Sequence, residues 1–201
     1  MTKFSDVPAA GITIRESADD GSDFTNPDAD YRRLFLGEDG ALHLKDSAGT
    51  VTDVSAAFVG ASYATAVGQS IANNAAAAIV DFGTSVYDTD SAVTTGASWK
   101  FTAPSTGYYM VNVHVSFAAT TTWAAGERGW LQLLADGSVV NYLDRKDNFS
   151  NANEEMHLQG SAVVYLVATH YIDVRLVQNS GGALALSAYA ENNWIQVTKV
   201  G

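Results

Sequence analysis

The stretch that decides the fold of this chain lies near its middle and combines aromatic residues with a proline and a glycine. It reads Gly96-Ala97-Ser98-Trp99-Lys100-Phe101-Thr102-Ala103-Pro104-Ser105-Thr106-Gly107-Tyr108-Tyr109. Pro104 has no N–H and a fixed φ, so it belongs at a strand end, and Gly107 can adopt the backbone geometry with which the chain re-enters a sheet. The stretch therefore predicts a corner between two strands. Its large aromatic side chains, and one further along the chain, are expected to pack in a core: Trp99, Phe101, Tyr108 and Trp130.

Hydrophobic and polar residues alternate immediately after this corner. From residue 109 to residue 117 the odd positions carry Tyr, Val, Val, Val and Phe, whereas Asn112, His114 and Ser116 occupy even positions. Successive side chains of a strand point to opposite faces of its sheet. The segment is therefore expected to be a half-buried strand.

Short strand-like segments recur along the rest of the chain. Turns are expected at Asp136-Gly137, which suits a tight hairpin, and at 179–182, where a second hairpin is expected. Short strands separated by such turns, without a convincing long helix, predict an all-β sandwich. The expected strands are 63–71, 76–82, 99–101, 107–117, 129–135, 138–143, 156–166, 171–178, 183–189 and 194–199.

The alanine-rich stretch 56–78 is the one segment whose composition argues for a helix, because alanine has the highest helix propensity. Gly60, Gly68 and the Asn73-Asn74 pair interrupt it, and Thr65 and Val67 favour a strand. Strands are therefore the prediction here.

Residues 1–60 differ in composition from residues 61–201. They hold 11 of the 22 acidic residues, and the stretch 16–30 has almost no apolar content. That stretch is expected to be an extended arm or loop. Short β-compatible runs from 33 to 54, separated by Asp-Gly and Ser-Ala-Gly turns, predict a small β-meander. The expected organisation is an arm and meander over 1–60 and a sandwich over 61–201.

Composition excludes several classes of protein. The formal net charge of −11 repels phosphate backbones, and no cluster of Lys or Arg offsets it, so nucleic-acid binding is not expected. No apolar run approaches the roughly 20 residues that a membrane-spanning helix needs, and the amino terminus lacks a secretory pattern. The absence of cysteine removes disulfides and thiolate chemistry. An acidic folded protein made in the cytoplasm is expected.

The decisive stretch also resembles the signature of the complement globular-head family, which shares its jelly roll with tumour necrosis factor. In that family a strand ending in Phe-Thr-Ala-Pro, here 101–104, is followed by Gly-x-Tyr, here 107–109. Opening strands at 70–74, 79–82 and 86–88, a hairpin at 133–137 and a closing strand at 194–197 match in order. The resemblance implies a jelly roll and a homotrimer. Calcium on the trimer axis is known in the family, but Asp88 and Asp90 alone do not make a site.

The segment 33–51 resembles units near the virion-attached ends of bacteriophage fibre and decoration proteins. It consists of a strand, Gly37-Glu38-Asp39-Gly40, a second strand, and then Lys45-Asp46 and Gly49. The resemblance implies that residues 1–60 attach the chain to a major capsid protein or another virion protein. A generic pair of hairpins would give much of the same pattern.

The sequence contains no recognisable catalytic, cofactor or metal-binding motif. His43, His114, His157 and His170 are far apart in the sequence, although a sandwich could bring two of them together. The Glu154-Glu155 pair is expected to be solvated rather than to hydrolyse glycosides, because adjacent strand residues point to opposite faces. The acidic segments 19–23 and 28–30 lack the layout of an EF-hand loop. We expect no enzyme, no cofactor and no resident metal.

Two functions fit these observations. The first is a homotrimeric capsid decoration or head-fibre protein on a bacteriophage virion surface, made in the bacterial cytoplasm. The second is a tail-fibre or tail-tip protein that binds host cell-surface glycan. The second function needs aromatic residues on exposed loops, and the candidates are Trp123, Trp130 and Trp194.

Overall fold

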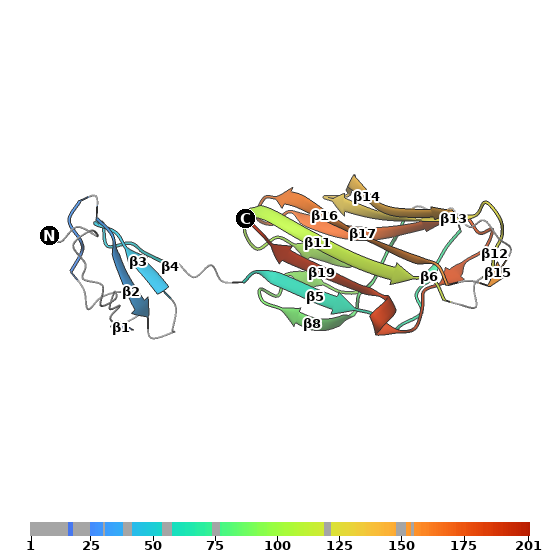
Figure 1. Cartoon of the computed structure of the whole chain (residues 1–201), viewed down its shortest axis with the longest axis horizontal. Coiled ribbons are helices and arrows are strands. Elements are labelled where there is room, and N and C mark those ends of the chain that lie inside the picture. Colours follow the sequence, from blue (N-terminus) through green and yellow to red (C-terminus); the bar gives the residue numbers. More distant parts are fainter. Residues whose placement is uncertain are drawn as a thin grey trace, which may run out of the picture. The chain divides into compact units, whose positions relative to one another are not determined.

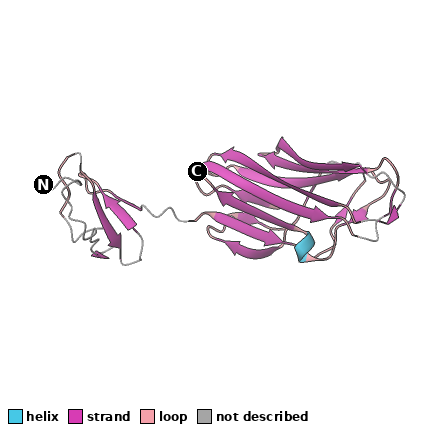
Figure 2. Cartoon of the chain, viewed as in Figure 1, coloured by secondary structure: helices cyan, strands magenta, loops and turns pink. Residues whose placement is uncertain are grey.

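The chain forms two compact units. The computed structural model describes residues 16–17, 25–29, 31–37, 42–53, 58–73, 77–118, 122–147, 152–153 and 155–201. The two units, within which most contacts between residues are made, are Met1–Ala57 and Phe58–Gly201 (Figure 1). Where they are described, the regular secondary structure of both units is strands, apart from a short 3₁₀ helix, η2, at Ala190–Asn192 (Figure 2). The protein is therefore all-β.

The first unit contains a four-stranded sheet with the order β1-β2-β3-β4. β2 to β4 form the antiparallel meander expected from the sequence, and β1 pairs with β2 in parallel. The Asp46 carboxylate accepts hydrogen bonds from the backbone N–H groups of Ala48 and Thr50 and so shapes the turn between β3 and β4. Much of the expected arm, 18–24 and 30, lies outside the described residues. The strands are β1 (Glu16–Ser17), β2 (Arg33–Gly37), β3 (Leu42–Lys45) and β4 (Val51–Asp53).

The second unit is a jelly-roll sandwich, as expected. One sheet has the order β16-β11-β19-β5-β8, and the other has the order β14-β13-β17-β10-β9, with β7 paired to β17. Two short pairs, β12 with β15 and β18 with β6, complete it. The strands are β5 (Gly60–Ala64), β6 (Ser70–Ile71), β7 (Ala78–Ile79), β8 (Thr84–Asp88), β9 (Val93–Thr94), β10 (Lys100–Thr102), β11 (Gly107–Ser116), β12 (Thr122–Trp123), β13 (Arg128–Ala135), β14 (Ser138–Asp147), β15 (Ala152–Asn153), β16 (His157–Leu166), β17 (Tyr171–Gln178), β18 (Leu184–Ala185) and β19 (Trp194–Lys199).

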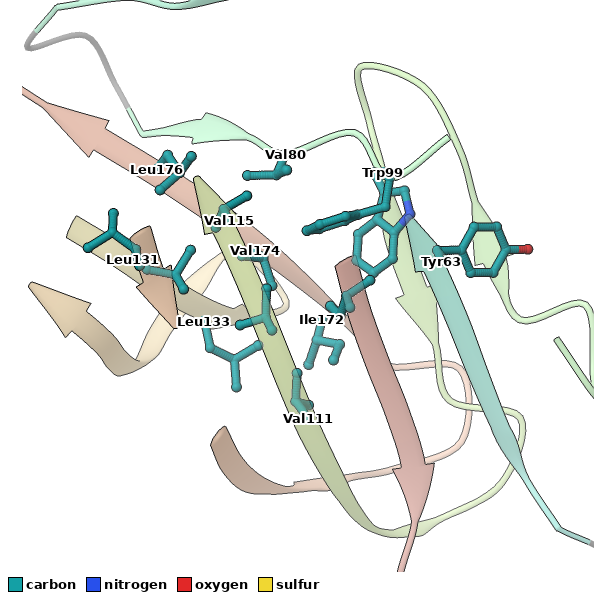
Figure 3. Packing of buried hydrophobic residues seen from close by; sticks show 14 of the residues in the cluster. Tyr63, Val80, Trp99, Val111, Val115, Leu131, Leu133, Ile172, Val174 and Leu176 are labelled. Carbon is teal, nitrogen blue, oxygen red and sulfur yellow. The ribbon is translucent and has the colours of Figure 1, made fainter. Parts of the chain in front are cut away.

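The core lies between the two large sheets. Val111 and Val115 of β11 lie among Leu131 and Leu133 of β13 and the buried side chains of β17 (Figure 3). Trp99, which is buried, closes one side of this core and meets Phe82 edge to face at 5.3 Å between ring centroids. The alternation predicted for 109–117 is confirmed, because all the odd positions are buried. Removal of these apolar surfaces from water is the main favourable contribution to folding.

The corner expected at Pro104 and Gly107 is present. Pro104 follows β10, Gly107 begins β11, and the Tyr109 hydroxyl donates to the carbonyl oxygen of Ser105 at 2.6 Å. A side chain at Gly107 would collide with the carbonyl oxygen of Gly201 and with the Lys199 side chain. This position therefore needs glycine for space.

Several expected strands are shorter than the sequence suggests. The segment 63–71 is broken after Ala64, since the Thr65 N–H donates to the carbonyl oxygen of Asn193 and the chain then turns to reach β6. Only Ala78–Ile79 of 76–82 and Leu184–Ala185 of 183–189 are strands within the described residues. No helix occurs in the described part of 56–78.

Of the two hairpins expected from the sequence, at Asp136-Gly137 and at 179–182, only the first is present. Asp136 and Gly137 both have positive φ and join β13 to β14 in the expected tight hairpin. The prediction of a second hairpin at 179–182 is wrong, because β17 and β18 belong to different sheets. The Gln178 side chain supports this crossing by donating to the carbonyl oxygens of Ile71 and Gly182.

The expectations for the core aromatics are confirmed for Trp99 and Phe101, which are both buried. The expectation is wrong for Tyr108, which is exposed because it lies one residue before the buried Tyr109 and points away from the core. Trp130 is only half-buried, since the core-facing positions of β13 are its neighbours Gly129 and Leu131.

Candidate functional site

One sheet of the sandwich has five strands, and three of them, β16, β11 and β19, carry no Asp, Glu, Lys or Arg on the outward face. The structure describes all three strands in full. These strands alternate, so the residues between their core positions form this face. The chain as a whole has 22 acidic and 11 basic residues. The residues of this uncharged face are Tyr108, Met110, Asn112 and His114 of β11, His157, Gln159, Ser161, Val163 and Tyr165 of β16, and Trp194, Gln196 and Thr198 of β19.

One end of the uncharged face is apolar. Tyr108 lies opposite Tyr165, and Met110 lies opposite Val163, in the pairing of β11 with β16. The two tyrosine rings meet edge to face at 5.2 Å between centroids. The exposed fractions of these four side chains are 53%, 55%, 37% and 60% in that order. Two cross-strand pairs therefore present a continuous apolar area to water.

The middle of the face is polar and hollowed. The Ser161 hydroxyl donates to the Asn112 side-chain oxygen at 2.6 Å across β11 and β16. Together with Gln159, Gln196 and Trp194, these residues line a hollow of about 340 Å³. The hollow offers amide and hydroxyl groups but no charge.

The other end of the face is a stack of aromatic rings. The His114 imidazole is stacked on His157 at 5.3 Å and on Trp194 at 6.1 Å between ring centroids. Burial lowers the pKa of His114, and the neighbouring His157 lowers it further. His114 is therefore held toward its neutral form.

Glu155 borders this stack. One carboxylate oxygen lies 3.7 Å from His157 Nε2, and the other accepts hydrogen bonds from the Ser116 hydroxyl at 2.7 Å and the Asn192 side chain at 2.9 Å. Glu155 was expected to be a solvated loop residue, but these contacts tie it to β11 and η2. Glu154 lies outside the described residues.

The three candidate glycan-contact tryptophans all lie on strands, so the expectation of exposed loops is wrong. Trp123 of β12 is buried and packs edge to face on Phe117 at 5.2 Å. Trp194 is part of the uncharged face. Trp130 of β13 lies near the guanidinium groups of Arg128 and Arg145, at 5.8 and 5.6 Å from the ring centroid.

The remaining histidines do not join a constellation. His43 is buried in the first unit and stacks on Phe35 at 5.2 Å. His170 contacts the Asp136 carboxylate at 2.6 Å beside the β13–β14 hairpin. No group of three or more His, Asp or Glu side chains is placed to hold a metal ion in the described part of the chain, and the acidic segment 19–23 lies outside it.

The described residues also contain no helix that is both long and apolar enough to span a bilayer.

The alternation of the sequence carries a signal for the uncharged face as well as for the core. The even positions of 108–114 and 194–198 and the odd positions of 157–165 contain no charged residue. The pairing of these segments could not be deduced from the sequence, because β11 pairs with β16 across a separation of many residues.

Comparisons with known proteins concern the fold. No family model matches the chain, and no curated protein matches it. Among solved structures, the chain is similar to Eiger TNF from S. frugiperda, with a TM-score of 0.52 and 16% identity over 72% of this chain and 93% of that one. The globular domain of zebrafish complement 1qA protein gives a TM-score of 0.49 at 14% identity, over 72% of this chain and 98% of that one. Murine APRIL gives 0.48 at 15% identity, over 71% and 99%. At such identities the likeness to Eiger TNF shows the fold alone, which is that of tumour necrosis factor.

Proposed function

We propose that the chain is a non-enzymatic structural protein of a bacteriophage particle, namely a homotrimeric capsid decoration or head-fibre protein on the virion surface. In this proposal the jelly roll is the self-associating head, and the first unit attaches it to another virion protein. The number of copies and the virion setting are what the two sequence resemblances imply. The observation that carries self-association is the uncharged face.

Charge explains why a second copy of this chain suits the uncharged face. Each copy has a net charge of −11, so two copies repel each other wherever acidic surfaces meet. The uncharged face permits close approach without bringing like charges together. Depletion of charge is also the compositional mark of the buried centre of protein interfaces.

The apolar end of the face supplies the favourable free energy. Tyr108, Met110, Val163 and Tyr165 form one exposed area, and Val200, which is also exposed, follows β19 beside Tyr108. Large contiguous apolar patches on soluble proteins mark interaction sites. Tyrosine and methionine are also enriched at interfaces.

The two-unit organisation supports a division of labour. The buried core cluster draws only on residues of the second unit, from Ala61 to Val197. The head should therefore fold without residues 1–57. The proposal therefore assigns attachment to the particle to the first unit.

Co-sedimentation tests the attachment. Full-length protein and a variant that lacks residues 1–57 are mixed with particles that lack the protein, pelleted, and compared at low and high salt. We expect the full-length protein to pellet and the truncated head to stay in solution. Attachment through the acidic first unit should weaken as salt shortens the Debye length below about 10 Å. Pelleting of the truncated head would reverse the assignment of the two units.

A second candidate function is recognition of host glycan, as in a tail-fibre or tail-tip protein. The specific observation in its favour is the hollow in which Trp194 lies beside Asn112, Gln159 and Gln196. Aromatic rings and amides are suitable partners for a neutral sugar. A glycan array with wild-type protein and Trp194→Ala distinguishes this function, because only glycan recognition predicts a signal that the substitution removes.

A further inference from the structure

A second hollow lies on the other sheet, away from the uncharged face. It has a volume of about 320 Å³, and its charged lining residues are Lys100 of β10 and Asp173 and Arg175 of β17. These three side chains point away from the core, because their strand neighbours Phe101, Ile172 and Val174 are buried in it. The volume falls at the lower end of the range for small-molecule sites.

Asp173 and Arg175 form a fixed pair in this hollow. Arg175 Nε donates to one Asp173 carboxylate oxygen at 2.6 Å, and the terminal Nη2 donates to the other at 3.1 Å. The Asp173 side chain is only 3% exposed although it lies on the outward face of the sheet. The carboxylate therefore orients the guanidinium and leaves its outer N–H groups without an acceptor among the described residues. An arginine held in this way loses little entropy when it binds a planar anion.

Lys100 supplies a second cation. Its ammonium group lies 5.0 Å from the centre of the Tyr171 ring, and it makes no ion pair with any residue that the structure describes. Two cations face one carboxylate here, so the lining has a net positive charge within a chain of net charge −11. The hollow thus concentrates donor groups whose positive charge favours an anionic ligand.

The remaining lining residues indicate the body of that ligand. Thr94 and Ser98 provide hydroxyl groups at the exposed rim, whereas Ile79 and Tyr171, which are half-buried, provide apolar surface. Hydroxyls with apolar ring surfaces suit a sugar ring, which has polar edges and apolar C–H faces. Lys100 and Arg175 suit a carboxylate on that ring.

We propose that this hollow binds an acidic monosaccharide unit, with its carboxylate between Lys100 and Arg175 and its hydroxyl groups toward Thr94 and Ser98. The site is on β10 and β17, whereas self-association is proposed for β11, β16 and β19. The two proposals can therefore fail separately.

The test is titration calorimetry of the full-length protein with sodium glucuronate at constant ionic strength. Glucose, which has the same ring without the carboxylate, and inorganic phosphate, which has charge without the ring, are the ligand controls. We expect glucose to bind at least about tenfold more weakly than glucuronate, since a lost charge-assisted contact has about that effect. We expect phosphate to bind more weakly than glucuronate because it lacks the ring that the rest of the lining contacts.

Variants then locate the site. Lys100→Gln should weaken glucuronate binding about tenfold, and the matched control Lys146→Gln on β14 should leave it unchanged. The double variant Asp173→Leu with Arg175→Met removes both charges together, so neither is left buried and unpaired, and it should fold but not bind. The proposal is overturned if glucuronate fails to bind up to its solubility, if phosphate binds as tightly, or if Lys100→Gln binds like the wild type.

Discussion

The imidazole ring of His114 on β11 stacks on that of His157 on β16, with 5.3 Å between the ring centroids. Two protonated rings at this distance would repel each other. The pKa of His114 is lowered, first by burial and then by His157, and Lys146 acts in the same direction. A backbone hydrogen bond at Asn192 and the Glu155 carboxylate oppose the shift without reversing it. The stack therefore depends on a neutral His114.

This relationship predicts a pH dependence of stability. The unfolded chain protonates His114 near its ordinary pKa of 6.5, whereas the folded chain does so only at lower pH. The contribution of His114 to the free energy of unfolding should therefore be fully present above pH 6.5. It should decrease as the pH falls from 6.5 toward the lowered pKa. The measurement is the urea midpoint as a function of pH.

His114→Asn should reduce the pH dependence in this window, and the control Gln159→Asn on the same face, which removes no titratable group, should not. The account is contradicted if wild type and His114→Asn lose the same stability between pH 6.5 and the acid limit of the measurement.

Gly160 offers a prediction about the contact between β14 and β16. A Cβ atom at this position would lie 2.6 Å from the carbonyl oxygen of Leu143 and 2.9 Å from its Cβ. Gly160→Ala should therefore lower the free energy of unfolding by about 1–3 kcal/mol, as overpacking does. Gly182→Ala is the matched control, because nothing lies within 4 Å of its added Cβ. Equal denaturant midpoints for the two variants would contradict this close approach.

The stability of a Trp99→Ala variant tests the packing of the core. The side chain is buried and packs against Phe82, so Trp99→Ala should cost about 3–5 kcal/mol in the free energy of unfolding. Tyr189→Ala, which truncates an exposed aromatic side chain, should change stability by less than about 0.5 kcal/mol. An unchanged melting temperature for Trp99→Ala would mean that this residue does not lie in the core.

The sequence predicted the long strands and the corner well, because these depend on local signals. Alternation between 109 and 117 placed Val111 and Val113 in the core, and Asp136-Gly137 marked the hairpin. The expected strands 63–71, 76–82 and 183–189 are longer than those of the structure, since strand ends are set by long-range hydrogen bonds such as that from Thr65 to Asn193 after β5.

The candidate sites depended on pairing that no local signal encodes. The uncharged face exists because β11 lies between β16 and β19. The second hollow, which Lys100 and Arg175 line, exists because β10 lies beside β17. Tryptophan alone was a poor guide to exposure, as buried Trp123 illustrates. An aromatic residue has the same sequence signal whether it packs in a core or contacts a ligand.

The mass of the protein in solution, measured by light scattering at micromolar concentration, tests self-association through the uncharged face most directly. Wild type should give three times the chain mass of 21.2 kDa. Tyr165→Glu, which places a charge in the apolar end of the face, should give a smaller mass, whereas Tyr189→Glu at an exposed position off the face should give the wild-type mass. A wild-type monomer, or a trimer that Tyr165→Glu leaves intact, would contradict the account.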